Sequence, residues 1–508
     1  MKAFWKNKDF IPVLISALLL IFSFPDYGIW IFAWVGFVPL FFALENKPRG
    51  RAFLLSYLAG VIFWSGTIYW LAHVTFFGTV LLILYLALYF GLFGLIFSAY
   101  RQRPAAYGLF FLPSIWVLLE YNRSHFLTGF PWALLGYSQY LNLPVIQIAD
   151  ITGVWGVSFL IMLVNVLIYQ AMGHRPWAID KKQSILTVFF LLVACLMYGF
   201  YKLHLRPTAY APSPIKISVI QPNIEQELKW SPGAREYIRN KYSALTQKAA
   251  EDKPDMIIWP EAALPGVLGE DDLIFNELLS LHEKIRTPLL LGAVVYQNDN
   301  YFNSALLIDD KGKIVKRYDK LHLVPFGEYI PLKNIFRFLE TIAPIGDIQK
   351  GSAFTVFTLS AIGYRPSANF SVLICFEDLF PELSSRFVME GAAFLINVTN
   401  DAWYKKTSAA KQHFQASVFR AVENRVNLIR SANTGVSGFI ASTGRIISVV
   451  KDKAGSEIFV DGYKTEALSL SPVRRTIYNR FPDSLILFSA VLAIYVIILT
   501  FKNPKSEE

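Results

Sequence analysis

The segment VLICFEDLFPEL (residues 372–383) contains the most informative residue of this chain, Cys375. Cys375 ends a run of β-type residues, SVLIC, and two carboxylates follow it directly. The only other cysteine, Cys195, lies in the apolar run ILTVFFLLVACLMYGF (185–200). A thiol in a lipid-embedded segment cannot reach one in a folded domain, so we expect no Cys195–Cys375 disulfide and a free thiol at Cys375.

Two other charged residues follow β-type runs upstream of Cys375. Glu261 comes directly after MIIWP (256–260), and Lys320 follows KIVKRYD (313–319). Taken alone, each has an ordinary explanation: a small core hydrophobe for the cysteine and solvated loop charges for the others. A charge at the end of a buried strand is costly unless paired, and these three side chains could satisfy one another. A thiol, an acid and an amine at strand ends are the parts of a nucleophilic acyl-transfer site.

The composition indicates a membrane protein with one soluble domain. The chain is 54% hydrophobic and 17% charged, which is too apolar for an ordinary soluble protein of this length. A bilayer core about 30 Å thick needs about 20 apolar residues in helical form. The sequence predicts eight such spans, near residues 9–25, 28–45, 53–72, 75–99, 107–120, 154–173, 185–203 and 481–501.

The charges that flank these spans predict their orientation. With the N-terminus in the cytoplasm, the cytoplasmic segments contain thirteen Lys and Arg residues, and the short segments on the other side contain only Arg123. This arrangement predicts cytoplasmic termini in a bacterial inner membrane and a soluble domain on the periplasmic side. It also accounts for part of the net charge of +10, so no nucleic-acid partner is needed to explain it.

The proline-rich stretch RPTAYAPSP (206–214) is the expected domain boundary. We therefore expect a seven-helix membrane domain at 1–205, a soluble domain at 206–475, and a last span with a cytoplasmic tail at 476–508. The soluble domain alternates strand-like and helical runs, which indicates an α/β sandwich with sites at strand ends. The expected strands are at 216–224, 255–261, 288–296, 371–378 and 393–401, the hairpins at 304–318 and 436–450, and the helices at 235–252, 272–285 and 411–429.

Motifs for metals and nucleotides are absent from the sequence. The seven histidines show no ligand spacing such as H-E-x-x-H, and cysteine pairs are lacking. There is also no Walker-type glycine loop. We expect neither a metal nor another cofactor.

Three motifs resemble those of the nitrilase, or carbon–nitrogen hydrolase, superfamily, which uses a Glu–Lys–Cys triad. They are WPEAALP, YDKLHLVPFGEYIP and LICFED, with separations of 59 residues from Glu261 to Lys320 and 55 onward to Cys375. The resemblance implies an α-β-β-α sandwich for the soluble domain. Soluble nitrilases have no membrane half, whereas this chain adds GFPWALLGYSQYLNLPVIQIADITGVWGVSFL (129–160) within its eight-span framework. That combination resembles the apolipoprotein N-acyltransferase family.

This resemblance implies a ping-pong acyl transfer between two lipid substrates. Cys375 would take an acyl chain from a phospholipid as a thioester, and the α-amine of a diacylglyceryl-cysteine at the N-terminus of an apolipoprotein would accept it. Glu261 would be the general base, and Lys320 would stabilise the oxyanion. No cofactor is implied, and nothing in the sequence requires more than a monomer.

The resemblance also implies supporting roles for further residues. Glu328 would orient Lys320 or the incoming amine, Asn303 would hold the loop that bears Lys320, and Glu377 would support the cysteine loop. Trp230 and Trp403 match tryptophans near the family's active site, and either could belong to a lid over the acyl chain. For both tryptophans, ordinary loop packing is the alternative.

One position departs from the family pattern. The residue after the nucleophile is often tyrosine in the family and is Phe376 here, so a role for that hydroxyl does not carry over. The backbone N–H of Phe376 remains available for an oxyanion hole. Three other functions stay open: a membrane-anchored amidase that hydrolyses a small C–N substrate, a non-enzymatic scaffold, and a transporter. The last is disfavoured because the predicted spans contain few ionisable residues.

Overall fold

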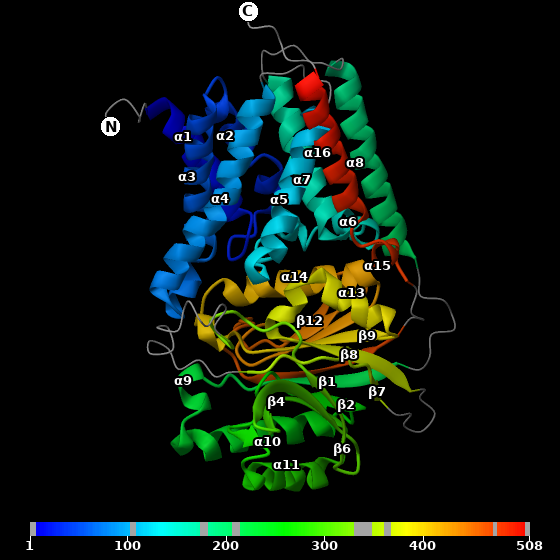
Figure 1. Ribbon diagram of the computed structural model, residues 1–508. Coiled ribbons are helices and arrows are strands. Elements are labelled where there is room, and N and C mark those ends of the chain that lie inside the picture. The colour runs from blue at the N-terminus through cyan, green and yellow to red at the C-terminus, as the bar shows by residue number, and fades with distance from the viewer. Residues whose placement is uncertain are drawn as a thin grey trace, which may run out of the picture. The chain divides into compact units, whose positions relative to one another are not determined.

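The computed structural model describes residues 7–101, 108–172, 181–205, 214–329, 348–359, 367–470 and 475–502. It divides into two compact units (Figure 1). One comprises residues 1–205 together with 480–508, and the other comprises residues 206–479. Most of the proline-rich stretch at 206–214 lies outside the described residues, so the structure describes the two units on either side of it.

The first unit is helical. Its helices are α1 (Asn7–Phe22), α2 (Val38–Leu44), α3 (Arg49–Thr67), α4 (Phe76–Arg101), α5 (Gly108–His125), α6 (Leu143–Ile146), α7 (Ala149–Met172), α8 (Lys181–His204) and α16 (Ser484–Lys502). Although α16 is distant in sequence, it packs against α5 and α7 (Figure 1). The sequence at 480–502 therefore completes the helical unit that the N-terminal part of the chain begins.

Among the described residues, three helices are long and apolar enough to cross a membrane: Phe76–Tyr100, Ala149–Met172 and Lys181–His204. Shorter apolar helices lie at Asp9–Phe22, Trp30–Leu44 and Ser484–Leu499. The run at 28–45, expected as one span, is instead a 3₁₀ helix (Trp30–Trp34) followed by the seven-residue α2. Seven helical residues rise only about 10 Å, which is too short to cross a bilayer core alone.

Small residues bring α3 and α4 close together. A Cβ added at Gly60 would lie 2.8 Å from Cβ of Phe90, and one added at Gly94 would lie 2.6 Å from the carbonyl oxygen of Ala52. Neither distance leaves room for a side chain without a shift of the backbone. Close approach at small residues is a common way for helices to pack in lipid, where apolar burial alone gives little attraction between them.

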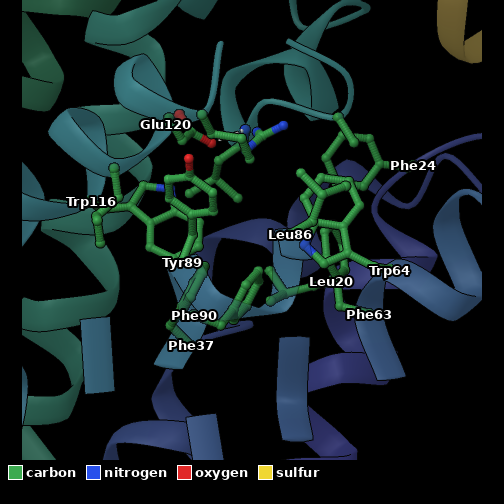
Figure 2. A pocket seen from close by; sticks show the side chains of 14 residues that line it. Leu20, Phe24, Phe37, Phe63, Trp64, Leu86, Tyr89, Phe90, Trp116 and Glu120 are labelled. Atoms are coloured by element: carbon green, nitrogen blue, oxygen red, sulfur yellow. Dashed lines mark hydrogen bonds between the residues drawn. The ribbon is translucent and has the colours of Figure 1, made fainter. Parts of the chain in front are cut away.

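A small cavity lies inside the helical unit (Figure 2). Aromatic side chains from α3, α4 and α5 surround it, together with Phe24 and Phe37, and Glu120 of α5 lies at its edge. The Glu120 carboxylate accepts the backbone N–H of Leu135 at 2.7 Å. The indole N–H of Trp64 has no hydrogen-bond partner among the described residues. The cavity therefore has polar atoms in an otherwise apolar wall.

The second unit is a four-layer α-β-β-α sandwich (Figure 1). One sheet has the strand order β13-β1-β2-β4-β5-β6, with β3 paired to β4, and the other has the order β12-β11-β10-β9-β8-β7. The strands are β1 (Ile215–Gln221), β2 (Met256–Ile258), β3 (Val267–Leu268), β4 (Leu289–Gln297), β5 (Asn300–Ile308), β6 (Ile314–Asp319), β7 (Phe357–Leu359), β8 (Ala368–Ile374), β9 (Phe394–Thr399), β10 (Asn427–Ala432), β11 (Gly438–Ile440), β12 (Ile446–Val449) and β13 (Gly462–Leu468). This arrangement confirms the expected sandwich.

Helices cover the outer face of each sheet. α10 (Arg235–Glu251) and α11 (Asp272–Ile285) pack on the first sheet, and α13 (Pro381–Met389) and α14 (Ala409–Asn424) pack on the second (Figure 1). α10 and α11 contact the first sheet through a cluster of buried apolar residues, which includes Ile238, Tyr242 and Leu278 from the helices. Between the sheets, the hydroxyl of Ser431 donates to the carbonyl oxygens of Ile220 at 3.0 Å and Ile258 at 3.2 Å.

One predicted helix is too long. The helical run at 411–429 ends as α14 at Asn424, and its last residues, NLI (427–429), belong to strand β10. The chain leaves the helix through Arg425, whose φ is 54°, a left-handed conformation typical of helix C-termini. Strand β10 then pairs in parallel with β9 over its whole length. This long-range pairing overrides the local helical spacing.

Candidate active site

Cys375 lies at a sharp turn between β8 and a short 3₁₀ helix (Cys375–Leu379). Its φ of 53° places it in the left-handed region, which non-glycine residues adopt only at a cost of about 1–3 kcal/mol. The carbonyl oxygen of Cys375 accepts a hydrogen bond at 3.1 Å from Asn397 of β9, which supports the turn. The strained turn thus presents the thiol at the end of β8 rather than within the ladder.

The surroundings of the Cys375 thiol favour its protonated form. Burial and the nearby Glu261 carboxylate raise the pKa of the thiol, and the positive charge of Lys320 offsets only part of this. Cys375 is a free cysteine. Because the thiolate is the nucleophilic form, reaction at this residue needs a base that removes the thiol proton.

Glu261 lies just past β2, in a loop pressed against β4. A Cβ added at Gly292 of β4 would lie 2.6 Å from the Cα of Glu261 and 2.7 Å from the carbonyl oxygen of Pro260, so only glycine permits this approach. The backbone N–H of Ala263 also donates to the carbonyl oxygen of Gly292 at 2.7 Å. The Glu261 carboxylate is buried and accepts a hydrogen bond at 2.8 Å from the Asn303 amide. This loop therefore holds the carboxylate in a defined position.

Lys320 follows β6 directly and is only 1% exposed. Its ammonium lies 2.9 Å from the Glu328 carboxylate and 3.6 Å from that of Glu261. Burial lowers the pKa of Lys320, but the charges of Glu328 and Glu261 outweigh burial and raise the pKa above its ordinary value. Lys320 is consequently a fixed positive charge beside the carboxylate of Glu261.

Asn303 of β5 connects the two carboxylates. Its amide nitrogen donates to Glu261 and to Glu328, at 2.8 Å in each case, and its backbone carbonyl accepts the N–H of Lys320 at 2.9 Å. Glu328 also accepts the backbone N–H of Val324 at 2.7 Å. Asn303 therefore fixes the spacing of the residues that surround the Lys320 ammonium.

Glu377 joins the cysteine loop to the lysine loop. Its carboxylate accepts the backbone N–H groups of Ile374 at 2.7 Å, Leu321 at 2.7 Å and His322 at 2.9 Å, and the hydroxyl of Tyr318 at 2.8 Å. The side chain is completely buried, and burial raises the pKa of Glu377 to about 7 although these bonds favour the ionised form. The carboxylate therefore holds the loops that carry Cys375 and Lys320 in a fixed position relative to each other.

We expect Glu377→Gln to slow acylation of Cys375 about 10²-fold, because a small displacement of either loop separates the reacting groups. Either orientation of the new amide points its NH₂ group at backbone N–H donors, which costs about 2 kcal/mol of stability. Single-turnover labelling and thermal unfolding measure the two effects. Glu382→Gln, on the exposed first turn of α13, is the matched control, and equal rates in both variants would contradict this role for Glu377.

A second buried network, which the sequence analysis missed, lies behind the cysteine loop. His413 contacts Asp378 at 2.8 Å and Asp401 at 2.9 Å, and Arg430 contacts the same two carboxylates at 2.9 and 3.2 Å. Burial alone would raise the pKa of both aspartates, but His413 and Arg430 hold it below the ordinary value. In turn, the two aspartates raise the pKa of His413 against burial and the Arg430 charge. This network of ion pairs fixes the loop after Cys375 to the loop that carries Trp403.

The two tryptophans lie on segments that are bonded to each other. Trp230, which follows α9 (Gln226–Lys229), and Trp403, in a 3₁₀ helix (Asp401–Tyr404), are each about half exposed. The amide of Asn400 donates to Gln226 at 2.8 Å, linking the two segments. Phe376 differs from both, because its ring is buried against Phe380.

The structure thus brings Glu261, Lys320, Glu328 and Asn303 into one bonded cluster, and the charges of Glu261 and Lys320 act on Cys375. It also places a buried lysine there that the sequence analysis missed. The ammonium of Lys229 donates to the carbonyl oxygen of Glu261 at 3.0 Å. A lysine next to an exposed tryptophan resembles an ordinary surface charge, so no local signal could have identified it.

Comparisons with known proteins place both units in known families. Residues 216–460 match the carbon–nitrogen hydrolase domain, so the sandwich and its site define a thiol-bearing member of that superfamily. A solved amidase from Nesterenkonia has a TM-score of 0.38 at 17% identity over 52% of this chain and 94% of the amidase. Residues 16–167 match the N-terminal domain of apolipoprotein N-acyltransferase.

Two curated relatives cover most of the chain, and both are named apolipoprotein N-acyltransferase. The protein from Geobacter metallireducens is 37% identical over 87% of this chain and 86% of its own length. The one from Chlorobaculum tepidum is 31% identical over 86% of this chain and 88% of its own length. The chain belongs to the apolipoprotein N-acyltransferase family, and it is an acyltransferase.

Proposed function

We propose that this enzyme moves a fatty acyl chain from a phospholipid, through a thioester on Cys375, to the α-amine of an N-terminal diacylglyceryl-cysteine of an apolipoprotein. The observation that carries the proposal is the buried cluster of Glu261 and Lys320, whose charges act on a free thiol at a strained turn. Membership of the N-acyltransferase family supplies the class of reaction. Apolar helices in the same chain suit lipid substrates.

In the first half-reaction, the Cys375 sulfur attacks the ester carbonyl of the phospholipid while Glu261 takes the thiol proton. The negative charge that develops on the carbonyl oxygen faces the fixed charge of Lys320 and the backbone N–H of Phe376. One such donor typically contributes about 3–4 kcal/mol in a water-poor site. The C–O bond then breaks, and the leaving glycerol oxygen takes the proton from Glu261. The products are a Cys375 thioester and a lysophospholipid.

The second half-reaction uses the same residues in the opposite order. The neutral α-amine of the acceptor attacks the thioester carbonyl, and Glu261 removes a proton from the attacking nitrogen. The C–S bond breaks, the sulfur of Cys375 recovers a proton from Glu261, and the acyl group leaves as an amide on the acceptor. Glu328 and Asn303 keep the Lys320 ammonium in place through both steps.

Water must be excluded from the thioester between the two half-reactions. Trp230 and Trp403 are suited to this task because they are half exposed and lie on two segments bonded to each other. In this proposal, the linked segments form a lid over the acyl chain and admit the acceptor when they open.

The proposed topology follows the charge distribution of the sequence. Eight segments cross the inner membrane, seven within residues 1–205 and one within 476–508, with the catalytic domain (206–475) in the periplasm and both termini in the cytoplasm. In this topology the run at 28–45 crosses as a broken helix. The proposed mechanism needs no residue from a second chain, and we propose that the enzyme works as a monomer.

The test is a two-stage reaction with the purified full chain in phospholipid nanodiscs. The donor phospholipid carries a labelled acyl chain, and the acceptor is a diacylglyceryl-cysteine peptide. We expect lysophospholipid and labelled protein before the acceptor is added, and labelled N-acyl peptide with loss of protein label afterwards. An N-acetylated acceptor peptide is the control and should take no label. Release of free fatty acid with no acyl peptide would favour a hydrolase instead.

A further inference from the structure

Lys229, the last residue of α9, is buried in the catalytic site although its neighbour Trp230 is half exposed. It is only 5% exposed, and a buried ammonium is costly unless something in the protein compensates it. Among the described residues, its hydrogen bond goes to the backbone carbonyl of Glu261, at 3.0 Å. One bond to a neutral carbonyl does not offset the loss of water from a charge, so nearby negative charge must contribute.

The electrostatics of Lys229 identify that negative charge. Burial lowers the pKa of Lys229 to about 8, and the charges of Glu261 and of the Cys375 anion act in the opposite direction. The interaction is reciprocal: an ammonium that the Cys375 anion stabilises also stabilises that anion. Lys320 differs because two carboxylates already surround its ammonium. The carbonyl of Glu261 takes one N–H donor of Lys229, whereas an ammonium has three.

The charges of the catalytic cluster indicate what Lys229 contributes to the reaction. The cluster beside the thiol contains two carboxylates, Glu261 and Glu328, and Lys320 balances only one of them. With Lys229 the cluster is neutral, and without it the cluster carries one negative charge. Without Lys229, moving the proton from Cys375 to Glu261 forms a thiolate in a buried cluster that still carries one net negative charge. A buried site of that kind opposes thiolate formation.

The remaining buried carboxylates near Cys375 have partners of their own and need no help from Lys229. Glu377 accepts hydrogen bonds from three backbone N–H groups and a tyrosine hydroxyl. Asp401 lies between His413 and Arg430. The pair of Glu261 and Glu328 therefore has one negative charge that Lys320 does not balance, and Lys229 supplies the second positive charge.

We propose that Lys229 is a positioning residue of the acylation step, which holds the Glu261 loop through its backbone carbonyl and stabilises the Cys375 thiolate with its ammonium charge. This inference rests on the proposed function for the identity of the acyl donor. Its central claim concerns the Cys375 thiol alone and is testable without any lipid substrate.

The experiment measures the rate at which iodoacetamide alkylates Cys375 at pH 7, in full-length protein that carries Cys195→Ala so that one thiol remains. We expect Lys229→Met to lower this rate about tenfold or more, since a neighbouring charge shifts a pKa by about 1–3 units. The matched control is Lys216→Met. Lys216 also donates to a backbone carbonyl, that of Asp252 at the end of α10, and should leave the rate unchanged when replaced.

Chemical rescue separates the charge from a merely structural role. Lys229→Ala removes the atoms of propylammonium, so added propylammonium should restore alkylation of Cys375, whereas tetramethylammonium, which has no N–H donor, should not. Alkylation of Lys229→Met within threefold of the parent rate would overturn the proposal. So would a loss that propylammonium fails to restore. A third outcome separates this proposal from the proposed function. If the Lys229 variants show the expected loss of alkylation but the parent enzyme takes no label from phospholipid, the role of Lys229 stands and only the phospholipid donor is rejected.

Discussion

Replacing Cys375 with alanine is expected to abolish the acyl-enzyme and to lower N-acyl transfer by about four orders of magnitude or more. The turn offers no other nucleophilic side chain that could carry the acyl group. Lys320 and the backbone N–H at residue 376 can still bind the substrate carbonyl, but they cannot form the acyl-enzyme. The measurement is protein-bound label from an acyl-labelled phospholipid, with and without neutral hydroxylamine, which cleaves thioesters. In the parent enzyme, hydroxylamine should remove the label.

Cys195→Ala is the matched control, because it removes the only other thiol of the chain from helix α8 of the apolar unit. This variant should label and transfer like the parent enzyme. Label that persists in Cys375→Ala and resists hydroxylamine would place the acyl group on a hydroxyl or amine instead. That result would reject the thioester mechanism while leaving the family assignment intact.

The second large effect is expected at Lys320. Lys320→Met should slow acylation by about 10³-fold, because it removes the fixed positive charge that faces the developing oxyanion. The variant also leaves Glu261 and Glu328 as neighbouring buried charges, and removal of one partner of a buried ion pair costs about 3–5 kcal/mol. Single-turnover labelling and thermal unfolding report these two effects separately.

The double variant Lys320→Met/Glu328→Gln separates catalysis from stability. It removes one carboxylate along with the ammonium, so much of the lost stability should return while acylation stays slow. A double variant that acylates at the parent rate would show that Lys320 serves only to balance buried charge. In that case the backbone N–H of Phe376 would be the principal oxyanion donor.

Much of the sandwich was predictable from local sequence. The buried strands are continuous runs of β-branched and large apolar residues, and the turns DDKG and STGR sit between such runs, so β5–β6 and β11–β12 appeared as hairpins. Strand β10 was not predictable, because the periodicity of α14 continues into its first residues. Only pairing with β9 shows where the helix stops.

The membrane half was predictable in composition and less so in detail. Apolar runs identify segments suited to lipid, and α4, α7 and α8 have the expected length. Hydropathy does not distinguish one long helix from a 3₁₀ turn followed by a short helix, which is the form of residues 30–44. Backbone hydrogen bonding decides between them, and apolar composition is the same in both.

The sequence by itself determined the reaction class. Glu261, Lys320 and Cys375 each stand at the end of a β-type run in a motif that resembles one superfamily, and chemistry requires those residue types. Strand ends of a sandwich meet at a common edge, so the motifs also predicted that the three would converge.

Only the tertiary structure decided how this site is held and charged. Contacts between residues up to 59 positions apart in sequence produce three features of the site. These are the support of the Glu377 carboxylate by four donor groups, the network of Asp378, Asp401, His413 and Arg430, and the burial of Lys229. Burial and electrostatic pairing arise from three-dimensional distances, and a charged residue looks the same in sequence whether water or a carboxylate surrounds it. The folded arrangement alone therefore sets which charges act on the thiol.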